Sequence, residues 1–121
     1  MNLKYLAGIF DTRGFLRFDY GRSYSYQITF NFTEREKNLW IEIKKEMESI
    51  CVPKIYKLKR KKGRLQEYQL CISGKKNTYN FLIKILPFSK RKEEILTMLK
   101  VLTERGRGLK DDKVAQKVDG D

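Results

Sequence analysis

The stretch that sets the interpretation of the whole chain lies at residues 5–14 and reads Tyr5-Leu6-Ala7-Gly8-Ile9-Phe10-Asp11-Thr12-Arg13-Gly14. Its apolar residues, together with Leu3, recur at helical spacing, and Gly14 stands where a helix would end. We therefore predict a short helix over residues 2–12. The small pair Ala7 and Gly8 would allow a second helix to approach it closely, either inside the domain or from another subunit.

Two hairpin patterns follow this helix. In residues 16–32, apolar and polar residues alternate on both sides of a turn at residues 21–23, which is typical of two antiparallel strands. A second alternating region begins at Lys54, where we expect Tyr56 and Leu58 to face inward and Lys57 and Lys59 outward. A basic turn around Gly63 then leads into a fourth strand that carries Tyr68, Leu70 and Ile72 on its apolar side.

Helices are predicted after each hairpin. Thr33 and Glu36 have the spacing of a capping box for a helix that ends before Pro53. Asn77 is expected to cap a third helix that Pro87 stops, and Ser89 is expected to start a fourth. The predicted order αββαββαα indicates an α+β domain whose four strands form one antiparallel sheet with helices on its apolar side. We assign residues 1–106 to this domain and residues 107–121 to a charged tail.

The amino-acid composition limits the classes of function that the protein can have. The 121 residues carry a formal net charge of +12, which is typical of proteins that bind a polyanion such as nucleic acid and, less often, an anionic membrane surface. Histidine is absent and the two cysteines are isolated, so zinc sites and histidine-based acid–base chemistry are excluded. We find no transmembrane-length apolar run and no secretory signal. We therefore expect an intracellular protein without a membrane partner, in a prokaryotic cytoplasm or an organelle.

The polar side of the predicted sheet is the candidate binding surface. Its amides, hydroxyls and cations suit base edges and phosphates. The adjoining segment 54–64 holds seven Lys or Arg and no acid, which favours contact with a polyanion over a merely solvated hairpin tip. The predicted nucleic-acid-binding residues are Arg17, Gln27, Thr29, Asn31, Lys57, Lys59, Lys61 and Gln69.

Residues 5–14 resemble the signature motif of the LAGLIDADG homing endonucleases. Two further stretches resemble the single-motif, homodimeric branch of that family: Thr29 to Trp40, and Asn80 to Phe88 with the lysine-rich segment that follows. The resemblance covers roughly residues 3–105 and implies the LAGLIDADG homing-endonuclease fold with a saddle-shaped sheet. It also implies a homodimer on double-stranded DNA, with an interface that we assign to Leu3, Ala7, Gly8 and Asp11.

One position departs from the family pattern. The acid that binds the catalytic metal in that family stands just before the last glycine, and Arg13 occupies this place. A guanidinium has no lone pair to offer Mg²⁺, so we expect cleavage to be lost or impaired, and we expect no cofactor except Mg²⁺ if cleavage is retained. The resemblance places Glu34 and Lys76 at ancillary catalytic positions. Each residue also has a non-catalytic explanation. Glu34 would be a carboxylate in the first turn of a helix, and Lys76 would be a lysine that contacts phosphate.

The sequence therefore favours a DNA-binding homodimer built on a nuclease scaffold. A maturase-like or structural protein bound to structured RNA or to the ribosome is the first alternative, because a basic and aromatic surface also suits RNA. An active endonuclease with an unusual metal site is the second. The oligomeric state distinguishes the DNA-binding hypothesis from the RNA-binding hypothesis, since a palindromic DNA site requires a dimer.

Overall fold

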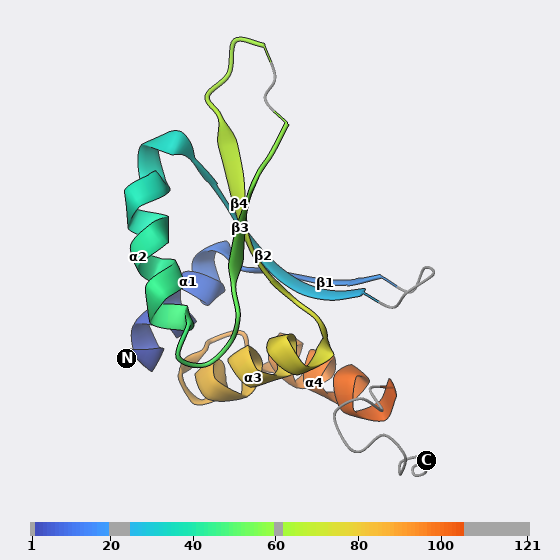
Figure 1. The fold of residues 1–121 in the computed structure, drawn as a ribbon. Helices are drawn as coiled ribbons and strands as arrows, with labels where there is room; N and C mark the ends of the chain where they lie inside the picture. The colour runs from blue at the N-terminus through green and yellow to red at the C-terminus, as the bar shows by residue number, and fades with distance from the viewer. Residues whose placement is uncertain (1, 20–24, 60–61, 106–121) are drawn as a thin grey trace.

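The computed structural model describes residues 2–19, 25–59 and 62–105 (Figure 1). The predicted αββαββαα order is confirmed, with two short 3₁₀ turns added. In the described residues, no helix has the length and apolar content that a membrane crossing needs. The elements in chain order are α1 (Leu3–Arg13), β1 (Phe15–Asp19), β2 (Ser25–Thr33), η1 (Glu34–Glu36), α2 (Lys37–Met47), β3 (Lys54–Lys57), β4 (Glu67–Ser73), α3 (Lys75–Ile85), η2 (Leu86–Phe88) and α4 (Lys92–Arg105).

The four strands form one antiparallel sheet in the order β1-β2-β4-β3, so the inner strands of the two hairpins pair at its centre. The central register sets Phe30 opposite Leu70 and Asn31 opposite Gln69. In Figure 1 the β3–β4 hairpin rises away from β1, so the two halves of the sheet diverge and leave an open angle on the side without helices. This is the saddle-shaped sheet that the sequence predicted.

The core lies between the helices and the apolar face of the sheet. Phe30, on the central strand β2, is fully buried, with its ring centroid 5.6 Å from Trp40 of α2 and 6.4 Å from Phe81 of α3. Phe10 of α1 meets Phe81 edge to face at 6.4 Å. Aromatic residues of α1, α2 and α3 thus pack together with β2 on one side of the sheet. The opposite side of the sheet stays uncovered because these three helices lie on the same side.

One predicted helix cap is wrong, and another forms only in part. Thr33 makes no side-chain capping bond, but the Glu36 carboxylate accepts the Thr33 backbone N–H, which is the other half of the capping box, and also pairs with Arg13. The chain passes through the 3₁₀ turn η1 before α2 begins. Gly74, not Asn77, precedes α3, with a φ of +99° that favours glycine. The Asn77 side chain accepts a hydrogen bond from the Val52 N–H at 2.6 Å and donates to the Val52 carbonyl at 2.9 Å, which ties α3 to the segment before β3.

The first strand of the second hairpin, β3, has the opposite phase to the predicted one, whereas β4 turns Tyr68, Leu70 and Ile72 toward the core as predicted. Ile55 lies opposite Leu70 and packs against the core, whereas Tyr56 lies opposite Gln69 on the uncovered face. Lys57 lies opposite Tyr68, on the side of the helices. Ile55 and Tyr56 are adjacent apolar residues, so alternation alone left two registers open, and burial of the aliphatic residue selects the observed one. The predicted tail, residues 107–121, lies outside the described residues.

Candidate nucleic-acid interface

The uncovered side of the sheet, which we call the open sheet face, carries mostly polar side chains with a few aromatic rings. Among the residues that the register places on it are Phe15, Arg17, Gln27, Thr29, Asn31, Thr33, Lys54, Tyr56, Glu67, Gln69, Cys71 and Ser73. Part of this face forms an open groove of about 500 Å³ that runs up to the end of α1 and is lined by Thr12, Arg13, Phe15, Arg17, Thr29, Asn31 and Gln69.

Five of the predicted binding residues lie on this face, namely Arg17, Gln27, Thr29, Asn31 and Gln69. Thr29 is only 3% exposed between its neighbours Phe15 and Cys71, so its hydroxyl has little access to a ligand. The placement of Lys57 on this face is wrong, because its strand has the other phase. Lys59 is exposed beyond the end of β3, and Lys61 lies outside the described residues.

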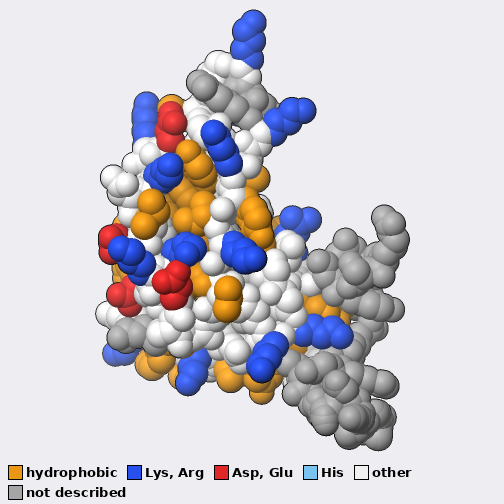
Figure 2. Space-filling view, viewed as in Figure 1, with side chains coloured by type: hydrophobic (Ala, Val, Ile, Leu, Met, Phe, Trp, Pro, Cys, Tyr) orange, Lys and Arg blue, Asp and Glu red, His pale blue; other side chains and the backbone are white. Residues whose placement is uncertain are grey.

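Three exposed residues of the open sheet face are not among the predicted binding residues. Phe15 is 61% exposed on β1, and Tyr56, which is 49% exposed, and the exposed Lys54 lie on the other edge strand, β3. Extending the alternation of Leu16 and Arg17 back by one residue would have placed Phe15 here. Figure 2 shows Lys and Arg side chains along the arm of the molecule that the β3–β4 hairpin forms, around an apolar centre.

Arg13, at the last position of α1, is bound by its own chain. Its Nη2 donates to the Asn31 carbonyl at 2.9 Å and lies 3.1 Å from the Glu36 carboxylate, and its guanidinium sits 5.4 Å from the Trp40 ring centre. The hydrogen bond from Arg13 lowers the pKa of the Glu36 carboxyl. The pair is therefore fully charged above the ordinary pKa of glutamate and is lost as the pH falls through the lowered pKa.

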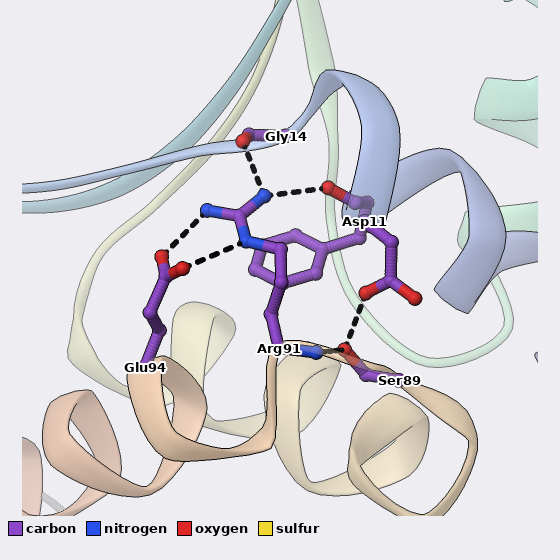
Figure 3. Close-up of polar contacts among 6 residues, drawn as sticks. Asp11, Gly14, Ser89, Arg91 and Glu94 are labelled. Atoms are coloured by element: carbon purple, nitrogen blue, oxygen red, sulfur yellow. Dashed lines mark hydrogen bonds and ion pairs between the residues drawn. The ribbon is translucent and has the colours of Figure 1, made fainter.

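The preceding acid, Asp11, binds the start of α4. One of its carboxylate oxygens accepts the Ser89 hydroxyl and the other accepts the Lys90 N–H at 2.8 Å. Beside it, the Arg91 guanidinium donates to the carbonyls of Phe10 at 2.8 Å and Gly14 at 2.7 Å (Figure 3). These contacts fix the end of α1 against α4.

The side chains at the end of α1 do not fit the divalent metal that the family resemblance implies. Arg13 has no lone pair, and the carboxylates of Glu36 and Asp11 already accept hydrogen bonds on both oxygens. Across the described ranges, no three His, Cys, Asp or Glu residues gather into a group that could hold a metal ion. Burial raises the pKa of the Cys51 thiol to about 12, so it does not supply a thiolate at neutral pH.

The two ancillary positions are not brought together within one subunit. Glu34 follows Thr33, which pairs with Glu67 at one end of the central strand pair, whereas Lys76 follows Ser73, which pairs with Gln27 near the other end. Six residues of strand separate the two ends, or about 20 Å. Both side chains are exposed. The ancillary catalytic roles of Glu34 and Lys76 stay predictions.

The exposed face of α1 differs from the predicted interface. Ala7 is 0% exposed and belongs to the core, Leu3 is half-buried, and Asp11 binds the start of α4. Of the four predicted interface residues, only Gly8 is on the exposed side, and a Cβ added to it would meet no atom within 4 Å. The face that α1 presents to solvent includes Lys4, Tyr5, Gly8 and Thr12.

A comparison with solved structures found that homing endonucleases have a similar structure. The chain matches I-CvuI in complex with its target with a TM-score of 0.69 and 17% identity, over 84% of this chain and 66% of that one. It matches I-TnaI with a TM-score of 0.64 and 14% identity, over 89% and 76%. The LAGLIDADG meganuclease I-AabMI bound to uncleaved DNA matches with a TM-score of 0.65 and 18% identity, over 93% and 42%.

The chain thus spans about two thirds of the length of I-CvuI and less than half of I-AabMI. No protein-family model and no curated protein sequence matches it. The likeness therefore comes from the arrangement of the elements, which agrees with the motif at residues 5–14. By its element order, its saddle-shaped sheet and these structural matches, the chain has the fold of the LAGLIDADG homing endonucleases.

Proposed function

We propose that this protein binds duplex DNA through the open sheet face and does not cut it. The observation that carries the proposal is the open sheet face itself, where amides and cations lie on a surface that none of the described helices covers. A two-stranded or four-stranded antiparallel ribbon fits the major groove, where amides can reach base edges and cations reach phosphates. The net charge of +12 and the DNA complexes of I-CvuI and I-AabMI support the same ligand.

The absence of cutting follows from the end of α1. A metal-assisted phosphodiester cut needs a cation that polarises the phosphate and activates water. Arg13 and its partner Glu36 form a closed ion pair there, and Asp11 is bound to the start of α4. These residues hold the helix end in place and leave no free carboxylate for a metal.

The binding form is a homodimer that meets through the exposed face of α1. Gly8 lets a second copy of the helix approach closely, with Tyr5 and Thr12 at either side of the contact. A two-fold axis at this helix would place two open sheet faces on one duplex, so the DNA site would be a pseudo-palindrome. A single subunit on structured RNA is the competing form.

Removing two cations from the open sheet face is expected to reduce the salt dependence of DNA binding. In the double variant Arg17→Ala/Lys54→Ala, each lost phosphate contact lowers the slope of log K against log salt by about 0.9. The control Lys84→Ala/Lys100→Ala removes the same charge from the exposed side of α3 and α4 and is expected to keep the wild-type slope. Anisotropy titrations with a selected duplex in the presence of Mg²⁺ measure the slope for both double variants. The DNA strands are then run on a denaturing gel to detect cleavage.

Intact strands with a reduced slope for the open-face variant support the proposal. Equal slopes for the two double variants would remove the open sheet face from the interface. Tighter binding to a structured RNA than to any duplex from the pool would favour the maturase-like alternative, and strand cleavage by the wild type would show that a metal site forms from other groups.

Changing Gly8 to alanine is expected to have opposite effects on the monomer and on the dimer. Within the monomer, alanine has free space at this exposed helix position and stabilises the helix by about 0.5 to 1 kcal/mol. Between subunits, the added methyl groups push the paired helices apart and weaken self-association. Thermal unfolding of dilute protein measures the first effect, and sedimentation equilibrium measures the second. A wild-type protein that stays monomeric at all accessible concentrations contradicts the homodimer.

A further inference from the structure

The two central strands carry a pair of amides that bind each other on the open sheet face. Asn31 of β2 and Gln69 of β4 are directly opposite in the register, and the Gln69 Nε2 donates to the Asn31 Oδ1 at 3.0 Å. Asn31 is exposed and Gln69 is half-buried. Both line the groove of about 500 Å³ that ends at α1.

This hydrogen bond limits what the pair can offer to a ligand. An amide side chain has one carbonyl oxygen and one NH₂ group, and each amide uses one of them on the other. If Gln69 donates, its carbonyl and the NH₂ group of Asn31 remain free. If the two amides both turn over, the NH₂ group of Gln69 and the carbonyl of Asn31 remain free. In either case the groups that are wholly free are one NH₂ donor on one amide and one carbonyl acceptor on the other, while the two bonded groups each keep one further N–H or lone pair.

The charged neighbour of the pair is already occupied. Arg13 donates through Nη2 to the Asn31 backbone carbonyl and pairs with Glu36, so its contact holds the Asn31 backbone. Arginine is the commonest reader of guanine, because guanine offers two acceptors in the major groove. With Arg13 engaged, the side-chain groups free for hydrogen bonding at this row of the sheet include the amide pair and the Tyr56 hydroxyl opposite Gln69.

One base edge matches one donor beside one acceptor. In the major groove adenine shows an acceptor at N7 and a donor at N6, whereas guanine shows two acceptors, cytosine one donor, and thymine one acceptor and a methyl group. We propose that Asn31 and Gln69 act as a single unit that reads adenine in the major groove. The inference rests on the proposed DNA binding and adds the base that this part of the surface selects.

The test begins with a randomised duplex pool selected by the full chain, followed by measurement of affinity for each base at every position. We expect one position at which adenine is preferred by about 5- to 100-fold. Asn31→Ala and Gln69→Ala are each expected to remove this preference at the same position, and the double variant is expected to lose no more than either single variant, since the two amides work together.

Exchanging one amide for a carboxylate is expected to change the base instead of only weakening the contact. In Gln69→Glu, one N–H of the Asn31 NH₂ group donates to the new carboxylate, so position 69 offers acceptors only and the free groups of the pair become mainly acceptors. Cytosine, with its N4 donor, then becomes the favoured base at that position. Gln27→Ala is the matched control: it removes an amide from the same face of β2, opposite Arg17 and Ser73, and leaves the adenine position unchanged.

The possible results separate the inference from the proposed function. A pool that yields no bound duplex overturns DNA binding and the inference with it. Binding in which Asn31→Ala and Gln69→Ala change different positions, or change none, overturns the adenine-reading unit and leaves DNA binding intact. An adenine preference that both variants abolish, with a shift to cytosine in Gln69→Glu, supports the inference.

Discussion

Replacing Arg91 with alanine is expected to lower the free energy of unfolding by about 2 to 4 kcal/mol, because hydrogen bonds from a charged group and a cation–π contact are lost together. The Arg91 side chain is only 22% exposed. Its Nη1 holds the carbonyls of Phe10 and Gly14, and its guanidinium carbon lies 4.3 Å from the Phe10 ring centre. Without it, the Gly14 carbonyl loses this partner and the Phe10 carbonyl keeps only the Gly14 N–H.

Urea unfolding followed by circular dichroism measures this loss. Arg17→Ala serves as the control, because it removes the same side chain from an exposed position on the open sheet face and is expected to change stability by under about 0.5 kcal/mol. Arg91→Lys should fall between the two, since a lysine cannot bind both carbonyls and Glu94 at once. Equal midpoints for Arg91→Ala and Arg17→Ala would mean that α4 does not hold the end of α1.

Replacing Gly14 with alanine is expected to destabilise the fold by about 1 to 3 kcal/mol through overpacking. The added Cβ would lie 2.5 Å from the Phe10 Cδ1 atom and 2.9 Å from the Phe10 carbonyl oxygen. Backbone strain plays no part, because the φ of Gly14 is −78°, which alanine adopts freely. The last glycine of the motif is therefore required by close approach to Phe10.

Gly8→Ala provides the comparison within the same helix. Its Cβ points into open space, so the two glycine-to-alanine changes should move the thermal midpoint of the dilute protein in opposite directions. A Gly14→Ala variant as stable as the wild type would show that Phe10 can move aside. That result would also weaken the account of Arg91, whose guanidinium packs on the same ring.

The order of the elements could be predicted from the sequence because each one carries a strong local pattern. The helical spacing of Leu6 and Phe10 and the alternation of Ile28, Phe30 and Phe32 reflect burial on one side, and the structure buries all of them. These patterns also place Gln27 and Asn31 on the opposite side of β2. The β2 part of the candidate site could therefore be identified from the sequence.

Three features could not be predicted from local patterns. The phase of β3 depended on whether Ile55 or Tyr56 packs against the core, and this is decided by the helices. The pairing of Asn31 with Gln69 needed the register between two strands that lie far apart in the sequence. The ion pair of Arg13 with Glu36 is a tertiary contact that the capping-box spacing does not show, and the Glu36 carboxylate shares itself between Arg13 and the Thr33 backbone N–H.

The contacts between α1 and the start of α4 have a consequence for the order of folding. Lys90 is 79 residues away from Asp11, and Arg91 is 81 residues away from Phe10. On the ribosome the first helix emerges long before its partners are synthesised, and its carboxyl end stays in water until the last helix arrives. The groove beside Arg13 is thus completed only once nearly the whole domain has been translated, so a nascent or truncated chain would not present a finished binding surface.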